Sequence, residues 1–543
     1  MAEMELHRTH DAKNYELQSR GLENTSSQDN DEQQLDVLSR LGKLPVLKRN
    51  FGFLSILGFT CTILITWEAV FIIFDVSILN GGPAGFVYGF LFVWAGSLAT
   101  YASLGELASM SAPTAGGQYH WVAMLAPPGS HKILSYMTGW LTVIGWQAGF
   151  ATANLVSAAL IQGLIVLTRP NYDPKPYHHM LLFWAVMAFA VFINVLASTV
   201  LPKFEGLILV LHIVGYFAIL LPLLILGEHQ DPHQVFGLWL NLGNLPTQGT
   251  SFMVGLLGPV FMFLGADGAV HMSEEIQNAP TIVPWSILFS IIINGALALS
   301  MMIATLFVTV DLQSSLQSPT GYAFMDIFVQ ATGSLAGATV MPCIVTVMQL
   351  FANVGLLASC SRMSWSFARD RGLPGYKTLA KVNPRTSIPV ATIVATTMIS
   401  TLLSFIILGS STAFNNIISI AVAGLSASYA LAIGLLLWRR TTGGIKHSPL
   451  SGSRLTNTPG FELSWGPWYM PGILGPAVNL FAIIYVLIIL FFSFWPPDVP
   501  VDAANMNYTI LVTGIVMIFS VTWYLAWGRR DYKGPVIEAA SVL

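Results

Sequence analysis

Charged residues are scarce in this sequence, since only 9% of its 543 residues are Asp, Glu, Lys or Arg and the formal net charge is −3. The basic residues are spread over several segments and form no stripe, which argues against nucleic acid as a partner. Apolar residues make up 54% of the chain, and the mean hydropathy is +0.65. Because they fall in long blocks and do not alternate with polar residues, the composition indicates an all-α integral membrane protein.

Cysteine is rare as well. Cys61, Cys343 and Cys360 all lie inside apolar blocks, which excludes a disulfide framework and offers no metal-ligand spacing. The sequence also lacks an HExxH pair, a nucleophile elbow and a glycine-rich phosphate loop that ends in Lys-Ser/Thr. We therefore expect no metal, no cofactor and no enzymatic activity.

Long apolar blocks are abundant. A membrane-spanning helix needs about 20 mainly apolar residues, and the sequence contains twelve such blocks. They lie near 51–79, 84–110, 133–167, 180–201, 204–226, 252–273, 284–310, 335–361, 388–408, 413–438, 472–494 and 507–528. The sequence thus predicts a transporter-sized domain of twelve spans over residues 51–528.

The distribution of Lys and Arg predicts the orientation. With the N-terminus in the cytoplasm, only Arg169 and Lys175 of the 24 basic residues fall in the outer loops, and the other 22 lie in cytoplasmic segments or at the span ends that face them. This satisfies the positive-inside rule. Residues 1–50, which are polar and poor in aromatics, are expected to be a disordered cytoplasmic tail, and residues 529–543 a second cytoplasmic tail.

The sixth apolar block is interrupted by "GADG" at 265–268. In hydrocarbon every backbone polar group needs a partner, so a polar, glycine-rich break is tolerated only where it lines a cavity or is buried in protein. Asp267 adds an acid at mid-membrane depth, which is functional by default. The alternative is a glycine-packed helix contact with a hydrogen-bonded, neutral Asp267.

The first block contains a second interruption, "TWEA" at 66–69, with Asp75 closer to its outer end. Interrupted first and sixth spans are typical of transporters built from two inverted five-helix repeats, which hold the substrate between the breaks. Trp67 adjoins Glu68, and an aromatic face beside a carboxylate suits an ammonium group. Trp67 packing within the helix bundle is the alternative.

Acidic residues continue beyond the sixth break. If the helix resumes there, His271, Glu274 and Glu275 share one face with Asp267. Carboxylates at a helix C-terminus oppose its dipole, so they need cationic partners. The candidates are Arg362, Arg369 and Arg371. A solvated acidic helix end is the alternative, most of all for Glu274.

His212 lies in the fifth block, roughly 12 Å into the membrane from Pro202 and Lys203 at 1.5 Å per residue. A histidine there can take up and release a proton near neutral pH. A hydrogen-bonded structural histidine is the alternative.

Three separated motifs resemble the amino acid, polyamine and organocation superfamily, and within it the fungal branch of amino acid, GABA and choline permeases. "SLGELASMSAPTAGGQYHW" at 103–121 is similar to the end of that family's second span and the following loop, with the core residues Pro113, Ala115, Gly116, Gly117 and Tyr119. "EEIQNAPTIVP" at 274–284 resembles the signature that closes the sixth span. "SRMSWSFARDRGLP" at 361–374, followed by "VNPRTSIPVA", resembles the loop between the eighth and ninth spans.

The resemblance implies a twelve-span carrier with inverted repeats at about 51–226 and 252–438 and two additional helices at 472–528. It implies alternating access around a central site, usually driven by protons. The family's substrate lies against exposed backbone at the two breaks, which correspond here to 62–68 and 263–268. The predicted substrate contacts are Thr66, Trp67, Glu68, Phe263, Gly265, Ala266, Asp267 and Gly268.

The resemblance also implies roles for two other groups. Some proton-coupled relatives have a lysine in the fifth span where sodium-coupled relatives bind an ion, and His212 falls at or near that position. His212 is therefore the predicted proton-coupling residue. Glu275 with Arg362 and Arg369 is the predicted cytoplasmic gate.

The first break departs from the family pattern, because "CTILITWEA" contains no glycine to hold a substrate carboxylate. Glu68 would instead favour a cationic group, as in choline, a polyamine or the amino end of GABA, whereas a zwitterion could still use the amides at 265–268. The sequence predicts a secondary active transporter that imports a small amino or ammonium solute. The alternative is a nutrient sensor that retains the carrier fold without turnover, although such proteins often carry an enlarged signalling tail and the tail here is modest. Its membrane is expected to be the plasma membrane, with the vacuolar membrane as the alternative.

Overall fold

The computed structural model describes residues 47–111, 114–169, 171–196, 201–408, 413–447, 455–503 and 505–536. The predicted N-terminal tail lies outside the described residues up to position 46, and the predicted C-terminal tail lies outside them from position 537. Pro113 of the second-span motif is also outside them.

The regular structure of the described ranges is helical, apart from three isolated β-bridges. Ten helices there are long and apolar enough to cross a membrane. They are α2 with α3 (Phe53–Leu64 and Thr66–Ile72), α5 (Gly82–Ser111), α7 (His131–Thr168), α8 (Pro176–Leu196), α9 (Leu201–Leu226), α14 (Ala279–Val308), α17 (Leu335–Arg369), α20 (Ala413–Thr441), α21 (Leu474–Phe492) and α22 with its extension (Thr509–Trp523, continuing to Asp531). These match ten of the predicted blocks.

The other two predicted blocks form shorter helices. The block at 252–273 is divided into α11 (Gln248–Gly255), α12 (Leu257–Met262) and α13 (Gly268–His271), followed by a 3₁₀ turn at Ser273–Glu275. The block at 388–408 forms α19 (Val390–Ser404) and a 3₁₀ turn at Phe405–Leu408. The all-helical membrane fold is thus confirmed, whereas the count of twelve spans stays a prediction.

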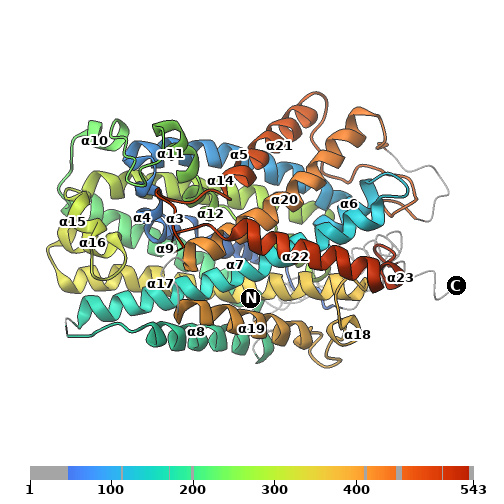
Figure 1. Ribbon diagram of the computed structural model, residues 1–543, viewed down its shortest axis with the longest axis horizontal. Helices are drawn as coiled ribbons and strands as arrows, with labels where there is room; N and C mark the ends of the chain where they lie inside the picture. The colour runs from blue at the N-terminus through green and yellow to red at the C-terminus, as the bar shows by residue number, and fades with distance from the viewer. Residues whose placement is uncertain are drawn as a thin grey trace, which may run out of the picture.

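Short helices cap the two ends of the bundle. Figure 1 shows α6, α18 and α23 at the end that carries the C-terminus, and α10, α15 and α16 at the opposite end. Their bounds are Gln118–Leu125 for α6, Tyr376–Leu379 for α18, Arg529–Asp531 for α23, Pro232–Phe236 for α10, Leu312–Leu316 for α15 and Ala323–Thr332 for α16.

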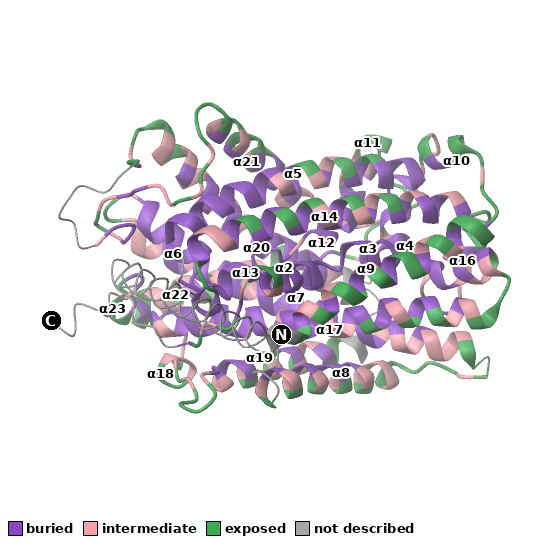
Figure 2. Ribbon diagram, turned by 180° about the vertical axis from the view of Figure 1, so that it is seen from behind, coloured by how far each residue is buried: buried purple, intermediate pink, exposed green. Residues whose placement is uncertain are grey.

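Burial differs sharply between the long helices. In the most apolar 18 residues of the first span 94% of the residues are buried inside the protein, whereas the corresponding share is only 11% in the span that begins with α22. Figure 2 shows the same contrast, with buried residues concentrated in α2, α5 and α20 and exposed residues along α8 and α9. A helix enclosed by protein on all sides can lose its regular hydrogen bonding without exposing the backbone to lipid. The first span occupies such a position.

Candidate functional site

The first span is interrupted at Ile65. Its φ of 37° and ψ of 45° are left-handed, and they separate α2 from α3. A β-branched residue rarely adopts this conformation, which costs about 1–3 kcal/mol. The break therefore lies one residue before the predicted "TWEA" interruption, and Thr66, Trp67 and Glu68 are helical. A smaller irregularity at Ile73 separates α3 from α4 (Phe74–Leu79).

The sixth block is not helical from Phe263 to Asp267, between α12 and α13, so the interruption begins two residues before the predicted 265–268 and ends before Gly268, which is helical. Gly265 has a φ of 102°, a conformation that favours glycine. The Tyr101 hydroxyl on α5 donates to the Phe263 carbonyl oxygen (2.8 Å), and the Gly265 amide donates to the same hydroxyl oxygen (3.3 Å). One side chain thus satisfies two peptide groups that the helix has released.

The two breaks lie next to each other. The Thr66 hydroxyl, at the start of α3, donates to the carbonyl oxygen of Met262 at the end of α12 (3.1 Å). A cavity of about 30 Å³ lies between the breaks, room for about two water molecules. Its lining includes Ile63, Leu64 and Ile65 from the first break, Phe261, Leu264 and Gly265 from the sixth, and Trp146, Gln349 and Leu425 from the surrounding helices.

The predicted substrate contacts take different positions around this cavity. Gly265 lines it directly. Thr66, Phe263, Ala266 and Gly268 are buried in or beside the two breaks. Trp146, which the sequence analysis missed, contributes an aromatic ring to the lining; no local signal distinguishes it from the other tryptophans in apolar blocks.

Trp67 and Glu68 face away from this cavity, towards α9. The Trp67 indole N–H donates to His212 Nδ1 (3.1 Å), and Glu68 Oε1 lies 2.7 Å from the same nitrogen. All three side chains are fully buried. The structure therefore brings together three residues to which the sequence analysis gave two separate roles.

The Glu68–His212 contact requires a proton between the two groups. A carboxylate oxygen and an imidazole nitrogen 2.7 Å apart form a hydrogen bond only if one of them carries the hydrogen. The hydrogen can reside on His212 Nδ1, which then donates to Glu68, or on Glu68, which then donates to His212. In the first arrangement Nδ1 has no lone pair left to accept the Trp67 N–H, and in the second the Glu68 O–H and the Trp67 N–H share one lone pair. Glu68 Oε2 and His212 Nε2 have no hydrogen-bond partner in the described part of the chain.

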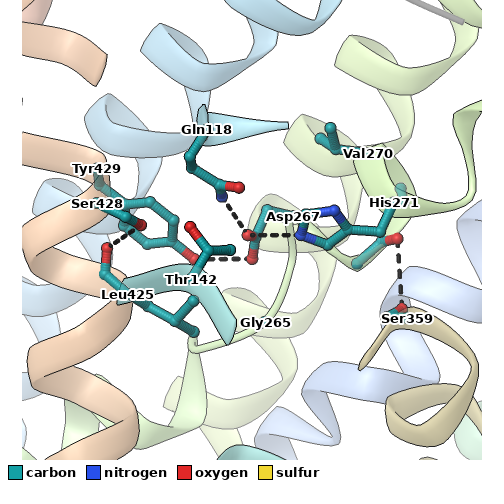
Figure 3. A network of polar contacts seen from close by, with 12 residues as sticks. Gln118, Thr142, Gly265, Asp267, Val270, His271, Ser359, Leu425, Ser428 and Tyr429 are labelled. Atoms are coloured by element: carbon teal, nitrogen blue, oxygen red, sulfur yellow. Dashed lines mark hydrogen bonds and ion pairs between the residues drawn. The ribbon is translucent and has the colours of Figure 1, made fainter. Parts of the chain in front are cut away.

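Asp267 is enclosed by donors from two other elements, as Figure 3 shows. The Gln118 amide at the start of α6 donates to Asp267 Oδ2 (2.6 Å), and the Tyr429 hydroxyl on α20 donates to Oδ1 (2.7 Å). His271 Nε2 lies 3.7 Å from Oδ2. Asp267 therefore joins the sixth break to α6 and α20. Gln118 was present in the "AGGQY" motif but was not recognised as its partner, and Tyr429 had no sequence signal.

The segment before α6 packs directly against this network. His271 Nδ1 lies 3.0 Å from the Ala115 carbonyl oxygen, which can only accept, so Nδ1 carries the hydrogen. A Cβ atom on Gly117 would come within 2.9 Å of His271 Cε1, and Gly117 has a φ of 59°. The glycine is needed for both the conformation and the close approach.

The predicted acid–arginine pairs form at the end of this segment. Arg362 Nε donates to Glu275 Oε1 (2.9 Å), and Arg369 Nη1 donates to both oxygens of Glu274 (3.1 and 3.2 Å). Arg369 thus pairs with Glu274, not with Glu275. The helix resumes only as far as His271, and Glu274 and Glu275 lie in a 3₁₀ turn, so the condition for all four residues to share one helical face is not met.

The C-terminal segment holds α6 in place. The Tyr119 hydroxyl donates to Asp370 Oδ2 (2.8 Å), and the Val536 amide donates to Oδ1 of the same carboxylate (2.9 Å). Tyr532 is fully buried, and its hydroxyl contacts Ser135, whose own hydroxyl donates to the Tyr119 carbonyl oxygen (2.7 Å). Contacts thus continue from the C-terminus through α6 to Asp267.

The sequence profile described as amino acid permease matches residues 51–517 of this chain. The chain belongs to the amino acid permease family. It is therefore a member of the amino acid, polyamine and organocation superfamily, as the motifs implied. It is a multi-pass membrane transporter and not an enzyme.

Relatives from fungi and plants match this permease over most of its length. A choline transporter of Saccharomyces cerevisiae is 30% identical over 493 residues, which cover 90% of this chain and 83% of that protein. Amino-acid permease 2 of Neurospora crassa is 25% identical over 506 residues, covering 92% and 89%. An amino-acid permease of Arabidopsis thaliana is 26% identical over 520 residues, covering 93% and 96%.

The Tyr101 hydroxyl provides a direct test of the sixth break. Replacing Tyr101 by Phe leaves the Phe263 carbonyl and the Gly265 amide without this partner, at a cost of about 1–3 kcal/mol per buried unpaired group. We expect a lower melting temperature of the purified permease in detergent. Tyr88, exposed on the same helix, is the matched control, and Tyr88→Phe should melt like the wild type. Equal melting temperatures for all three proteins would contradict the assigned hydrogen bonds.

Proposed function

We propose that this permease is a secondary active transporter that imports a small amino or ammonium solute together with protons, by alternating access. The observation that supports this proposal most strongly is that the two helix breaks, at Ile65 and at Gly265, line one small cavity. Relatives named as a choline transporter and as amino-acid permeases support a solute with an amino or quaternary ammonium group.

The proposed architecture has twelve spans with both termini in the cytoplasm. The divided segment from α11 to α13 and the shorter α19 supply the two spans beyond the ten long helices. Inverted repeats at about 51–226 and 252–438 agree with the breaks falling in the first and sixth predicted blocks. Helices at 472–528 are additional. We place the protein in the plasma membrane, with the vacuolar membrane as the alternative.

The cationic end of the solute is proposed to lie between the end of α2 and Trp146. The last carbonyl oxygens of a helix carry partial negative charge and lack partners within it. Ile63 and Leu64, at the end of α2, line the cavity opposite Gly265. The Trp146 ring supplies a face for cation–π attraction. Trp146 thus has the cation-binding role that was predicted for Trp67. The other predicted contacts, Thr66, Phe263, Ala266 and Gly268, form the backbone and walls of the two breaks.

The solute cannot enter the cavity at its present size. A volume of about 30 Å³ holds water but not an ammonium compound with several carbon atoms. The helices around the breaks must therefore separate on one side of the membrane at a time. The pairs Glu275–Arg362 and Glu274–Arg369 are the proposed cytoplasmic gate. Breaking a buried ion pair is costly, so the gate opens only if other contacts replace these pairs.

The proton is proposed to bind at the Glu68–His212 pair. Glu68 Oε1 and His212 Nδ1 share one hydrogen in this short contact. When that proton leaves, the net charge of the pair falls by one unit. Trp67 can donate to His212 Nδ1 only when Glu68 holds the hydrogen, so it favours that form, although the two donors then share one lone pair. Because this pair lies on α3 and α9 beside the first break, a change in its protonation changes the contact between these helices. Asp267 has a different proposed role: its hydrogen bond with Gln118 joins the sixth break to α6.

Uptake by the purified protein in proteoliposomes tests the solute class. Choline, GABA, spermidine and common amino acids should be compared as competitors at two pH values, with a radiolabelled solute. We expect cationic and amino solutes to compete, and uptake to increase when the outside is acidic. Solute binding without any uptake would instead identify a sensor that retains the permease fold.

His212→Ala tests the coupling site. Removal of the imidazole should abolish pH-dependent accumulation in proteoliposomes, because the proton shared with Glu68 has lost one of its two sites. Solute exchange between the two sides should continue, since it needs no net proton movement. Gradient-driven accumulation at the wild-type level in this variant would remove His212 from the mechanism.

A further inference from the structure

Glu205 is a buried acid that the proposed mechanism has not used. It lies on α9 with 1% of its surface exposed, and neither carboxyl oxygen has a hydrogen-bond partner in the described residues. The Thr62 hydroxyl is nearby, but its hydrogen is donated to the Gly58 carbonyl oxygen (2.8 Å). A buried carboxylate without a donor or a cation is unfavourable, so this group needs either a bound proton or access to water.

The contact between α2 and α9 is especially close at this level. A Cβ atom on Gly58 would lie 2.6 Å from the Glu205 carbonyl oxygen, so Gly58 allows the two backbones to approach. The carboxyl group is therefore enclosed in the interface of the broken first span with α9. It becomes accessible only when these two helices separate.

The helices packed against α9 supply no fixed counter-charge for Glu205. Besides Glu68 on α3, the titratable or charged residues of these elements are Cys61 on α2, Asp326 on α16, and Cys343, Cys360, Arg362 and Arg369 on α17, while α14 has none. Asp326 accepts hydrogen bonds from Ser315 and Gln330, and Arg362 and Arg369 are paired with Glu275 and Glu274. On α9 itself the other such residues are His212, Tyr216 and Lys203. The Tyr216 hydroxyl contacts the Ser300 hydroxyl (2.6 Å), and the Lys203 side chain lies outside the described part.

Glu205 and His212 lie on the same side of α9. Residues seven positions apart share a helix face, and a rise of 1.5 Å per residue separates them by about 10 Å. His212 contacts Glu68 on α3, and Glu205 lies against Gly58 on α2. A line of titratable groups thus follows the interface between the first span and α9, from mid-membrane towards the N-terminal end of α9.

We propose that Glu205 is a second proton-binding site, which receives the symported proton from the Glu68–His212 pair and releases it to the cytoplasm. This inference rests on the proposed proton coupling. In the transfer, the pair loses one proton and the Glu205 carboxylate becomes a carboxylic acid. Release then returns the carboxylate and gives the proton to cytoplasmic water. Because about 10 Å is too far for direct transfer, water must enter when α2 and α9 separate.

Solute uptake and proton influx measured together in proteoliposomes test this site. The vesicles carry a trapped pH-sensitive dye and receive radiolabelled choline, or the strongest competitor from the solute panel. The proteins are wild type, Glu205→Gln, which keeps the shape but cannot bind the proton, and Glu205→Asp, which keeps the carboxyl group. Glu228→Gln, an exposed acid just beyond α9, is the matched control.

We expect Glu205→Gln to lower proton-driven accumulation at least tenfold, Glu205→Asp to retain coupling with a shifted pH profile, and Glu228→Gln to match the wild type. A wild-type ratio of protons to solute in Glu205→Gln would overturn the Glu205 assignment alone. Wild-type uptake without any proton influx would overturn the coupling proposal and this inference with it. If Glu205→Gln fails to fold, an unshifted pH profile in Glu205→Asp overturns the assignment.

Discussion

The peptide groups released by the two helix breaks must find partners inside the protein, because the lipid offers none. Tyr101 supplies partners for Phe263 and Gly265, and Thr66 supplies one for Met262. These bonds fix the sixth break and join it to the first. The burial of 94% of the most apolar 18 residues of the first span makes this arrangement possible, since a helix facing lipid could not tolerate a left-handed residue such as Ile65.

Two polar networks flank the cavity, and their chemistry differs. The Glu68–His212 contact contains one hydrogen between two titratable groups, which suits a site that gains and loses a proton. The Asp267 carboxylate instead accepts from Gln118 and Tyr429, which keep their hydrogens near neutral pH. The first network connects the breaks to α9, and the second connects them to α6. Both networks thus join a surrounding helix to a break that lines the same small cavity.

The C-terminal segment extends the second network to the surface of the bundle. Tyr532 and Val536 fix Ser135 and Asp370, both of which contact Tyr119 beside Gln118. Burial, together with the nearby Asp370 carboxylate, raises the pKa of Tyr119 well above its usual value, so the hydroxyl remains a donor. The position of α6 therefore depends on contacts with residues more than 400 positions later in the chain, up to Val536.

Sequence reasoning located the sixth break, because "GADG" combines flexibility with a charge that hydrocarbon disfavours. It also paired Glu274 and Glu275, which follow that break, with arginines of α17, because opposite charges at the same end of a helix bundle attract each other. Ile65 could not be predicted, because a β-branched residue has no tendency towards a left-handed conformation. Because the break lies at Ile65, Trp67 and Glu68 are inside α3, where both contact His212 on α9. Gln118, Trp146 and Tyr429 reach the site through long-range packing that local patterns do not contain.

The most direct measurement is a cryo-electron microscopy map of the permease with a transported solute bound. The account predicts density for the solute between Ile63–Ile65 and Phe261–Gly265, beside Trp146, in an enlarged cavity. It also predicts that neither the first nor the sixth span is helical through these positions. Regular helical hydrogen bonding through both positions, or solute density elsewhere, would contradict it.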